Sequence, residues 1–254
     1  MSEKFWYLKS CSVFERLETA HIRRLESCSR ARRFPGGSPV YLPADEADAV
    51  YLLAAGRAKV CHLTEDGKQS ILAFIEPGEL FGELALLDPG ERDEYVETIE
   101  PSTVVMMPGD EVRQMMREYP QLSLGITKVI GLRRKRIERR LKQLLFMSNR
   151  QRLVHLLLEL AEQYGTVTPD AVELRIRLSH QDLANVIGST RETVTVTLGR
   201  LQLEGLLRVR RRRIKVLDLE RLARSVDRSA PRLVDRRTSR SVVPTRLGAP
   251  AMVS

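Results

Sequence analysis

Two short helical patterns joined by a glycine turn occupy residues 180–207, HQDLANVIGSTRETVTVTLGRLQLEGLL. Glycine at position 188 and serine at 189 separate the patterns, and a glycine suits the tight turn of a helix-turn-helix. The spacing predicts one helix from His180, a break, and a second helix with a polar outer face. The apolar positions that recur at helical spacing are Leu183, Val186 and Ile187, then Val194, Leu198 and Leu201.

The polar face of the second helix carries hydroxyls beside an Arg-Glu pair. Threonine is a mediocre helix former, so Thr190, Thr193, Thr195 and Thr197 need another reason. In two-helix DNA readers, the second helix enters the major groove while hydroxyls and amides bind phosphate. Arg191 suits guanine, Glu192 suits the cytosine amino group, and the apolar Val196 suits a thymine methyl. The alternative is a helical hairpin with a solvated polar face.

Charge is divided unevenly along the chain. Residues 1–120 hold 14 Lys and Arg against 21 Asp and Glu, whereas residues 121–254 hold 28 against 12. This predicts that only the C-terminal half meets a polyanion. The segment RVRRRRIKVLD at 208–218 adds a basic hairpin whose tip carries Arg211 and Arg212. We therefore expect double-stranded DNA as the partner, with a regulatory subunit that binds only protein as the alternative.

Short apolar runs broken by turn residues fill residues 33–112. The run VYLLAAGRAKVCHL is followed by the hairpin signal TEDGK and then by SILAFI. Such a pattern is typical of short antiparallel strands that close into a small β-barrel or sandwich.

From about Gly109 the pattern becomes helical. An apolar stripe with steps of three and four resembles a coiled-coil seam, which predicts packing against a second copy in a homodimer. Arg133 interrupts the stripe, and a charge at that position needs a partner. Ser148 is placed to cap a further helix, so we expect a hinge there. The stripe consists of Leu122, Ile126, Val129, Ile137, Leu141 and Leu144.

The segment GSTRETVTVTLGRL, with a basic hairpin after it, resembles the winged helix-turn-helix of the CRP/FNR family of transcription regulators. FGELALLDPGER at 81–92, called the sensor cassette below, resembles the phosphate-binding cassette of that family. The resemblance implies an α+β protein with a cyclic-nucleotide-binding-type β-roll at 1–110 and a dimerisation helix at 111–147. A winged helix-turn-helix at 148–222 would follow. Beyond it, residues 223–254 show no period and are rich in Arg, Ser and Pro, which predicts a flexible basic tail. We also expect a palindromic DNA site and contact with RNA polymerase.

By that resemblance, Arg191 and Glu192 fall on the base-reading pair of the family. Val196 stands where many members carry a second base-reading arginine, so the half-site is expected to lose one arginine-read G·C pair. The residues on or near phosphate contacts are Ser179, His180, Gln181, Ser189 and Thr193, and Thr190, Thr195, Arg211 and Arg212 complete the expected DNA-binding set.

The sensor cassette departs from that of cyclic-AMP binders. In those proteins the glutamate of the GEL motif and a later arginine hold the nucleotide, and Gly82, Glu83, Leu84 and Arg92 occupy these places. Two carboxylates follow Arg92, however, and they would repel a phosphate. The sequence therefore disfavours cyclic AMP.

The predicted winged helix-turn-helix most resembles that of the nitrogen-control regulators, which sense 2-oxoglutarate. In that branch two arginines and a glutamate hold the diacid, and Arg92, Arg133 and Glu138 fall on those positions. A small anionic effector of the 2-oxoglutarate type is thus one expectation. The alternatives are a structural role for Arg133, a surface pair of Glu138 with Arg134, and a regulator that is effector-independent or tuned by thiol oxidation.

Other classes of site lack support in the sequence. Cys11, Cys28 and Cys61 are too few for an iron-sulfur cluster, and their spacing suits neither a zinc site nor a disulfide framework. No nucleophile-base pair indicates an enzyme. No segment approaches the roughly 18 apolar residues of a membrane span, and no signal peptide is evident, so we expect a cytoplasmic protein. The sequence predicts a dimeric, sequence-specific DNA-binding regulator.

Overall fold

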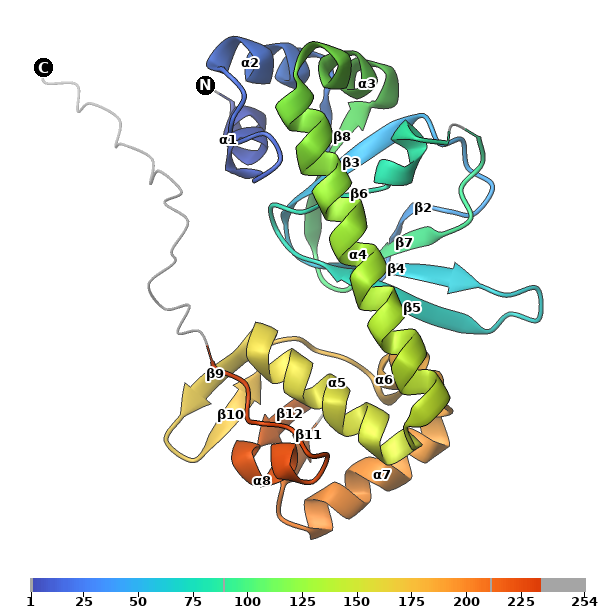
Figure 1. Ribbon diagram of the computed structural model, residues 1–254, viewed down its shortest axis with the longest axis vertical. Coiled ribbons are helices and arrows are strands. Elements are labelled where there is room, and N and C mark those ends of the chain that lie inside the picture. Colours follow the sequence, from blue (N-terminus) through green and yellow to red (C-terminus); the bar gives the residue numbers. More distant parts are fainter. Residues whose placement is uncertain (1, 89, 211, 234–254) are drawn as a thin grey trace, which may run out of the picture. The chain divides into compact units, whose positions relative to one another are not determined.

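A computed structural model describes residues 2–88, 90–210 and 212–233 (Figure 1). The chain divides into two compact units. The first comprises Met1–Leu153 with Arg177–Thr197, and the second comprises Val154–Ile176 with the chain from Leu198 onward. None of the described helices is long and apolar enough to cross a membrane.

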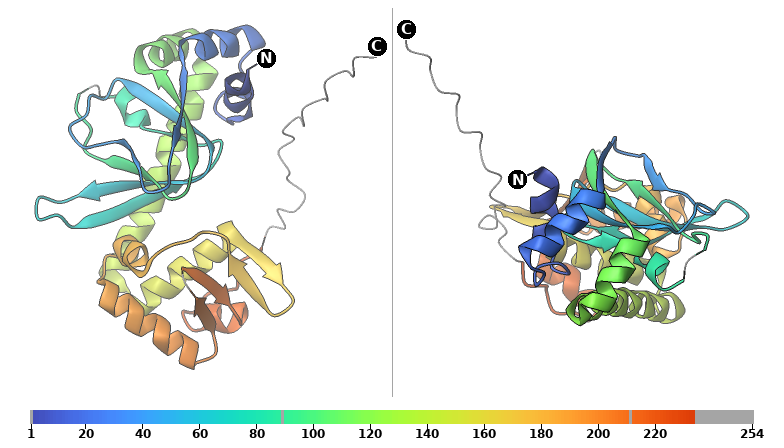
Figure 2. Two further views of the ribbon diagram at one scale, coloured as in Figure 1. Left: turned by 180° about the vertical axis from the view of Figure 1, so that it is seen from behind. Right: turned by 90° about the horizontal axis from the view of Figure 1, so that it is seen from above.

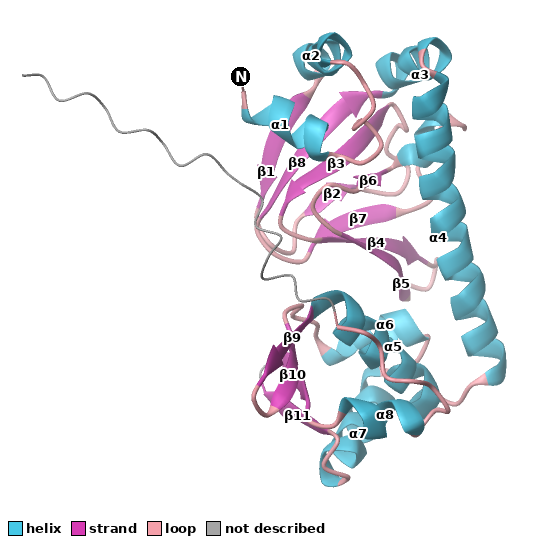
Figure 3. Cartoon of the chain, turned by 60° about the vertical axis from the view of Figure 1, so that its left-hand side comes forward, coloured by secondary structure: helices cyan, strands magenta, loops and turns pink. Residues whose placement is uncertain are grey.

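The β-roll of the first unit consists, within the described residues, of two four-stranded antiparallel sheets (Figure 3). One has the order β1-β8-β3-β6 and the other β2-β7-β4-β5. The TEDGK segment makes the turn between β4 and β5, as predicted, and its Gly67 has a φ of 78°. The strands are β1 (Arg30–Phe34), β2 (Pro39–Tyr41), β3 (Ala49–Ala55), β4 (Ala58–Leu63), β5 (Gln69–Ile75), β6 (Leu80–Phe81), β7 (Tyr95–Thr98) and β8 (Ser102–Pro108).

Helices close one end of the β-roll. α1 (Glu3–Ser10), α2 (Thr19–Cys28) and α3 (Gly109–Glu118) gather there, as the blue and green ribbons of Figure 2 show. Their apolar faces share a core with the faces of β3 and β8 that point away from the second sheet, in which Phe5, Ile22, Leu52, Met107 and Val112 are buried.

The expected single helix over 111–147 is two helices, which corrects that prediction. α3 ends at Glu118, and α4 (Pro120–Phe146) begins at a proline, whose missing N–H costs nothing in the first turn of a helix. The apolar stripe also has two roles. Leu122 and Ile126 are buried in the core of their own unit, whereas Ile137 is 47% and Leu141 54% exposed.

The break that underlies the hinge predicted at Ser148 is present, because α4 ends at Phe146 and α5 (Asn149–Tyr164) follows, and motion at this point stays a prediction. The Ser148 hydroxyl accepts from the Gln151 N–H at 3.3 Å and so caps α5. Two further helices are α6 (His180–Ile187) and α7 (Arg191–Leu203).

A four-stranded sheet of order β11-β12-β10-β9 belongs to the second unit as described. Its strands are β9 (Gly165–Thr168), β10 (Ala171–Leu174), β11 (Leu207–Arg210) and β12 (Arg213–Val216). The predicted domain boundary at 222/223 is wrong, because α8 (Leu219–Arg224) runs through it and buries Ala223. Most of the expected tail, 234–254, lies outside the described residues.

Candidate functional site

The limits of α6 follow from its local sequence. Its start is a capping box, in which the Ser179 hydroxyl accepts from the Asp182 N–H at 3.1 Å and the Asp182 carboxylate accepts from the Ser179 N–H at 2.9 Å. Its end is Gly188 in the left-handed region, with φ 61° and ψ 53°. The predicted start, turn and buried residues of this helix are confirmed. Ser179, His180 and Gln181 lie at its N-terminal end, where unpaired N–H groups favour anions.

α7 presents the polar face that the sequence predicts. Arg191, Glu192, Thr195 and Val196 are exposed, and Val196 is 55% exposed despite being apolar. The apolar residues predicted for the opposite face are buried, namely Val194, Leu198 and Leu201. Free side chains on the first two turns of a helix are what a major-groove reader requires.

The threonines of α7 divide between local structure and the exposed face. Thr190 caps the helix, accepting from the Thr193 N–H at 3.2 Å. Thr195 is exposed, donates to the Arg191 carbonyl at 2.8 Å and lies 2.8 Å from His180 Nδ1. Thr197 is buried and donates to the Thr193 carbonyl at 2.7 Å. The interpretation of these hydroxyls as DNA contacts is therefore wrong for Thr197, which satisfies its own helix.

The predicted basic hairpin is formed by β11 and β12. Arg210 pairs with Arg213 across it, and Arg212 at the tip is exposed with a φ of 65°. Lys215 is held by Glu173 of β10 at 3.3 Å, so it is less free than the tip. Arg211, also predicted to contact DNA, lies outside the described residues.

The sensor cassette brings Arg92 against two aromatic rings. A 3₁₀ helix η1 (Glu83–Leu86) follows Gly82, whose φ is 67°. This left-handed backbone favours glycine, and a Cβ at position 82 would lie 2.9 Å from Arg92 Nη1, so the guanidinium would have to shift to admit one. Arg92 is 6% exposed and lies 4.1 Å from the Tyr41 ring centre and 5.2 Å from that of Tyr51. Its Nη2 donates to the Ala49 carbonyl at 2.7 Å, and its Nε has no hydrogen-bond partner among the described residues.

Arg133 has the partner that its place in the apolar stripe demands. One of its Nη atoms donates to the Glu83 carboxylate and the other to the Leu80 carbonyl. The Glu83 side chain is 4% exposed and that of Arg133 18%, so water screens this pair poorly.

A second carboxylate, Glu94, belongs to the same cluster. It accepts from the Tyr41 hydroxyl at 2.7 Å. Burial raises the pKa of Glu94, and the charge of Glu83 adds to the rise, whereas the Tyr41 hydrogen bond and the two arginines oppose it. We refer below to Tyr41, Glu83, Arg92, Glu94 and Arg133 as the sensor cluster.

Two residues of the predicted effector site lie apart from the others. Glu138 pairs with Arg134 at 2.9 Å on the exposed face of α4, as the surface-pair alternative holds. Leu84 is 53% exposed and makes no part of the cluster core. The structure thus brings together Gly82, Glu83, Arg92 and Arg133 of that set.

A contact that the sequence did not reveal joins β4 to α6 within the first unit. Lys59 is 8% exposed, and its Nζ lies 2.9 Å from Asp182 and 3.5 Å from Glu97. Burial raises the pKa of the Asp182 carboxyl, but the hydrogen bonds from Ser179 and Lys59 outweigh it, so that the pKa falls below its usual value. A lysine in a strand pattern ordinarily indicates a solvent-facing position, so no signal in the sequence pointed to this pair.

The cysteines are poorly placed for a thiol switch. Cys11 and Cys61 are fully buried, and burial raises the pKa of each thiol to about 11. Burial also raises the pKa of Cys28. Protonated thiols react slowly, so the geometry disfavours regulation by thiol oxidation.

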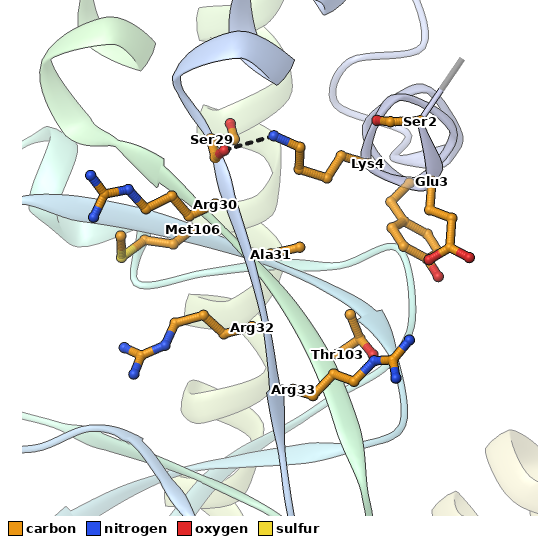
Figure 4. A pocket seen from close by; sticks show the side chains of 11 residues that line it. Ser2, Glu3, Lys4, Ser29, Arg30, Ala31, Arg32, Arg33, Thr103 and Met106 are labelled. Atoms are coloured by element: carbon orange, nitrogen blue, oxygen red, sulfur yellow. Dashed lines mark hydrogen bonds between the residues drawn. The ribbon is translucent and has the colours of Figure 1, made fainter.

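A hollow of about 940 Å³ lies beside β1 and is separate from the sensor cluster (Figure 4). Arg30, Arg32 and Arg33 line it, together with Lys4, which donates to the Ser29 carbonyl at 2.9 Å.

Known proteins of one family share both parts of the chain. Residues 31–119 match the cyclic nucleotide-binding domain, and residues 151–225 match the Crp-like helix-turn-helix domain. A global nitrogen regulator of Synechocystis is 30% identical over 185 residues, which cover 72% of this chain and 82% of that protein. The chain belongs to the CRP/FNR family of transcription regulators.

Other relatives agree with this assignment. A CRP-like cAMP-activated global transcriptional regulator of Mycobacterium tuberculosis is 29% identical over 217 residues, covering 85% of this chain and 97% of that one. The crystal structure of a CRP/FNR family regulator from Thermus thermophilus is 26% identical, with a TM-score of 0.66, and covers 79% of this chain and 100% of that one. The protein is thus a DNA-binding transcription regulator and not an enzyme.

Proposed function

We propose that the protein acts in the cytoplasm as a homodimer that binds a palindromic site in double-stranded DNA and contacts RNA polymerase. The observation that carries the proposal is the exposed face of α7, on which the side chains of Arg191, Glu192 and Val196 are open to solvent. Both ends of α6 and the start of α7 are capped, which fixes where the helix that carries the reading side chains begins.

The second half of α4 supports dimer formation. Ile137, Leu141 and Leu144 are 47%, 54% and 45% exposed, although they continue one helical stripe. Apolar residues aligned in this way are usually covered, and a second copy of α4 is the simplest cover. We expect sedimentation to show a dimer, and Leu141→Arg to shift it to monomer.

The DNA proposal is tested with a duplex selected from a random library, by fluorescence anisotropy at fixed salt. Arg191→Ala should weaken binding by about 10- to 100-fold and relax the preference at one base pair, because a bidentate guanine contact contributes about 1–3 kcal/mol. Arg23→Ala, which removes an equal charge from exposed α2, is the matched control and should leave the affinity unchanged. Wild-type affinity and preference in Arg191→Ala would contradict the proposal.

Gating by a small anion is a second candidate, favoured by the buried Arg92 and half-buried Arg133 of the sensor cluster and by the Nε of Arg92, which has no hydrogen-bond partner among the described residues. An anion of the 2-oxoglutarate type would have to displace Glu83 from Arg133, and Glu138 would have to leave Arg134. Under this candidate 2-oxoglutarate tightens DNA binding and Arg133→Ala abolishes the effect. An effector-independent regulator binds equally with 2-oxoglutarate, with cyclic AMP and with neither.

A further inference from the structure

We propose that the Glu83 carboxylate is a built-in anion of the sensor cluster, which occupies Arg133 in place of a bound effector and holds α4 on the cassette. Its consequence for DNA binding rests on the proposed function, but the occupancy itself can be tested without DNA.

The first support is the way in which Glu83 is buried. A buried carboxylate is stable only when a charge and hydrogen bonds compensate it. Glu83 is 3% exposed, and its ion-pair partner Arg133 comes from α4, 50 residues further along the chain. The second branch of that guanidinium binds the Leu80 carbonyl of β6. Both Nη atoms of Arg133 therefore bind this region of the β-roll, one at the Leu80 backbone carbonyl and the other at the Glu83 side chain.

The second support is the backbone that presents Glu83. The residue is the first of η1 and follows Gly82, which is left-handed and packed against Arg92. Because the φ of 67° at position 82 favours glycine, the direction in which Glu83 leaves the backbone is set by the turn that this glycine makes. The carboxylate is thus pre-organised toward α4 in the same way as an oxygen of a bound ligand would be.

The third support is the charge balance of the cluster. Glu83 and Glu94 oppose Arg92 and Arg133, so that the formal charges of these four side chains cancel. A dianion added to this set would leave two uncompensated negative charges in a poorly hydrated place. Removal of Glu83 alone would leave one uncompensated positive charge. The cluster as it stands needs no further anion, and it would accept one only in the absence of Glu83.

The first experiment follows thermal unfolding of the full chain in chloride buffer, with acetate, formate or 2-oxoglutarate added. The wild-type Tm should not respond to the added carboxylates. Glu83→Ala should lower the Tm by roughly 5–10 °C, because it leaves the half-buried Arg133 without its ion-pair partner. Acetate or formate should then restore at least half of the loss, and the double variant Glu83→Ala/Arg133→Ala should show no response.

Two further variants separate charge from shape. Glu83→Gln keeps the size and the hydrogen-bonding oxygen but removes the charge, so it should fold, should lie between wild type and Glu83→Ala in Tm, and should respond little to acetate. Glu138→Ala removes the exposed carboxylate from Arg134 on the same helix and is the matched control. It should leave the Tm within about 1 °C and insensitive to acetate.

The regulatory consequence is measured by anisotropy on the selected duplex. Glu83→Ala should bind about tenfold more weakly than wild type, and acetate should recover most of the loss. A wild-type Tm or DNA affinity that rises with 2-oxoglutarate would overturn the proposal, as would a Glu83→Gln variant identical to wild type in both. If the wild type binds its selected duplex no more tightly than a scrambled one, the proposed function is contradicted instead. The changes of Tm would still test the role of Glu83 in that case.

Discussion

The turn between α6 and α7 depends on a left-handed residue at position 188. Gly188 has a φ of 61°, and its N–H donates to the Ala184 carbonyl to end α6. We expect Gly188→Ala to lower the free energy of unfolding, since an L residue in this region costs about 1–2 kcal/mol. The smaller entropy of the unfolded chain returns about 0.4–1 kcal/mol, so that the net loss is about 1 kcal/mol.

Steric contact adds little to this figure. The new Cβ would lie 2.7 Å from Leu144 Cδ2, but that methyl ends a flexible side chain that is 45% exposed and can rotate away. For a chain of this size a loss of about 1 kcal/mol lowers the Tm by about 2–4 °C. Gly188→Asn should lose less, because asparagine tolerates the left-handed region.

Calorimetry of the full chain at pH 7 tests the reasoning, with Gly199→Ala as control. Gly199 lies inside α7, and a Cβ there meets nothing within 4 Å, so alanine should raise stability by about 0.5–1 kcal/mol. The same substitution thus has opposite signs at two positions 11 residues apart. A Gly188→Ala protein as stable as wild type would refute the conformational argument, and an equal loss in both variants would show that the backbone angle is not its cause.

Two further predictions concern buried charges. Lys59→Met keeps the apolar stem but leaves Asp182 without its cation, so the free energy of unfolding in urea should fall by about 1–3 kcal/mol at pH 7. The pKa of Asp182 is lower in the folded protein than in the unfolded chain, where it is near 4. The ionised carboxylate therefore stabilises the fold above about pH 4, and this stabilisation is lost as the pH falls through the folded pKa. The difference in free energy of unfolding between wild type and Lys59→Met should accordingly shrink below about pH 4. A gap that is constant with pH would contradict this. For Glu94 the pKa is raised, so its ionisation opposes folding as the pH climbs from the unfolded value through the folded one. The stability of Glu94→Gln, which can still accept from Tyr41, should therefore rise relative to that of wild type between pH 4 and pH 7, and urea midpoints at the two values check it.

Interactions between residues close in the sequence explain why the helix-turn-helix could be predicted. The capping box at Ser179, the left-handed glycine at 188 and the hydroxyl cap at Thr190 act over three or four residues. The apolar spacing of each helix then decides which side is buried. The start of α6, the exposed Arg191 face and the basic hairpin followed from these short-range rules.

Long-range pairing explains what the sequence left open. Helical spacing predicts that one face of α4 is covered, but it does not identify what covers it. Leu122 is buried in the core of its own unit, whereas Leu141 is exposed. The position of Arg133 in the apolar stripe indicated only that it needs a partner. The sequence did not identify Glu83 as that partner, because 50 residues separate the two.

The sequence by itself determined the family, the order of the elements and the side chains exposed on α7, because each depends on neighbours along the chain. Only the tertiary structure decided which charges neutralise one another in the interior. Lys59 pairs with Asp182, and Glu83 pairs with Arg133, through contacts between segments that are distant in the sequence. The free energy of a buried charge depends on its contact with such a partner.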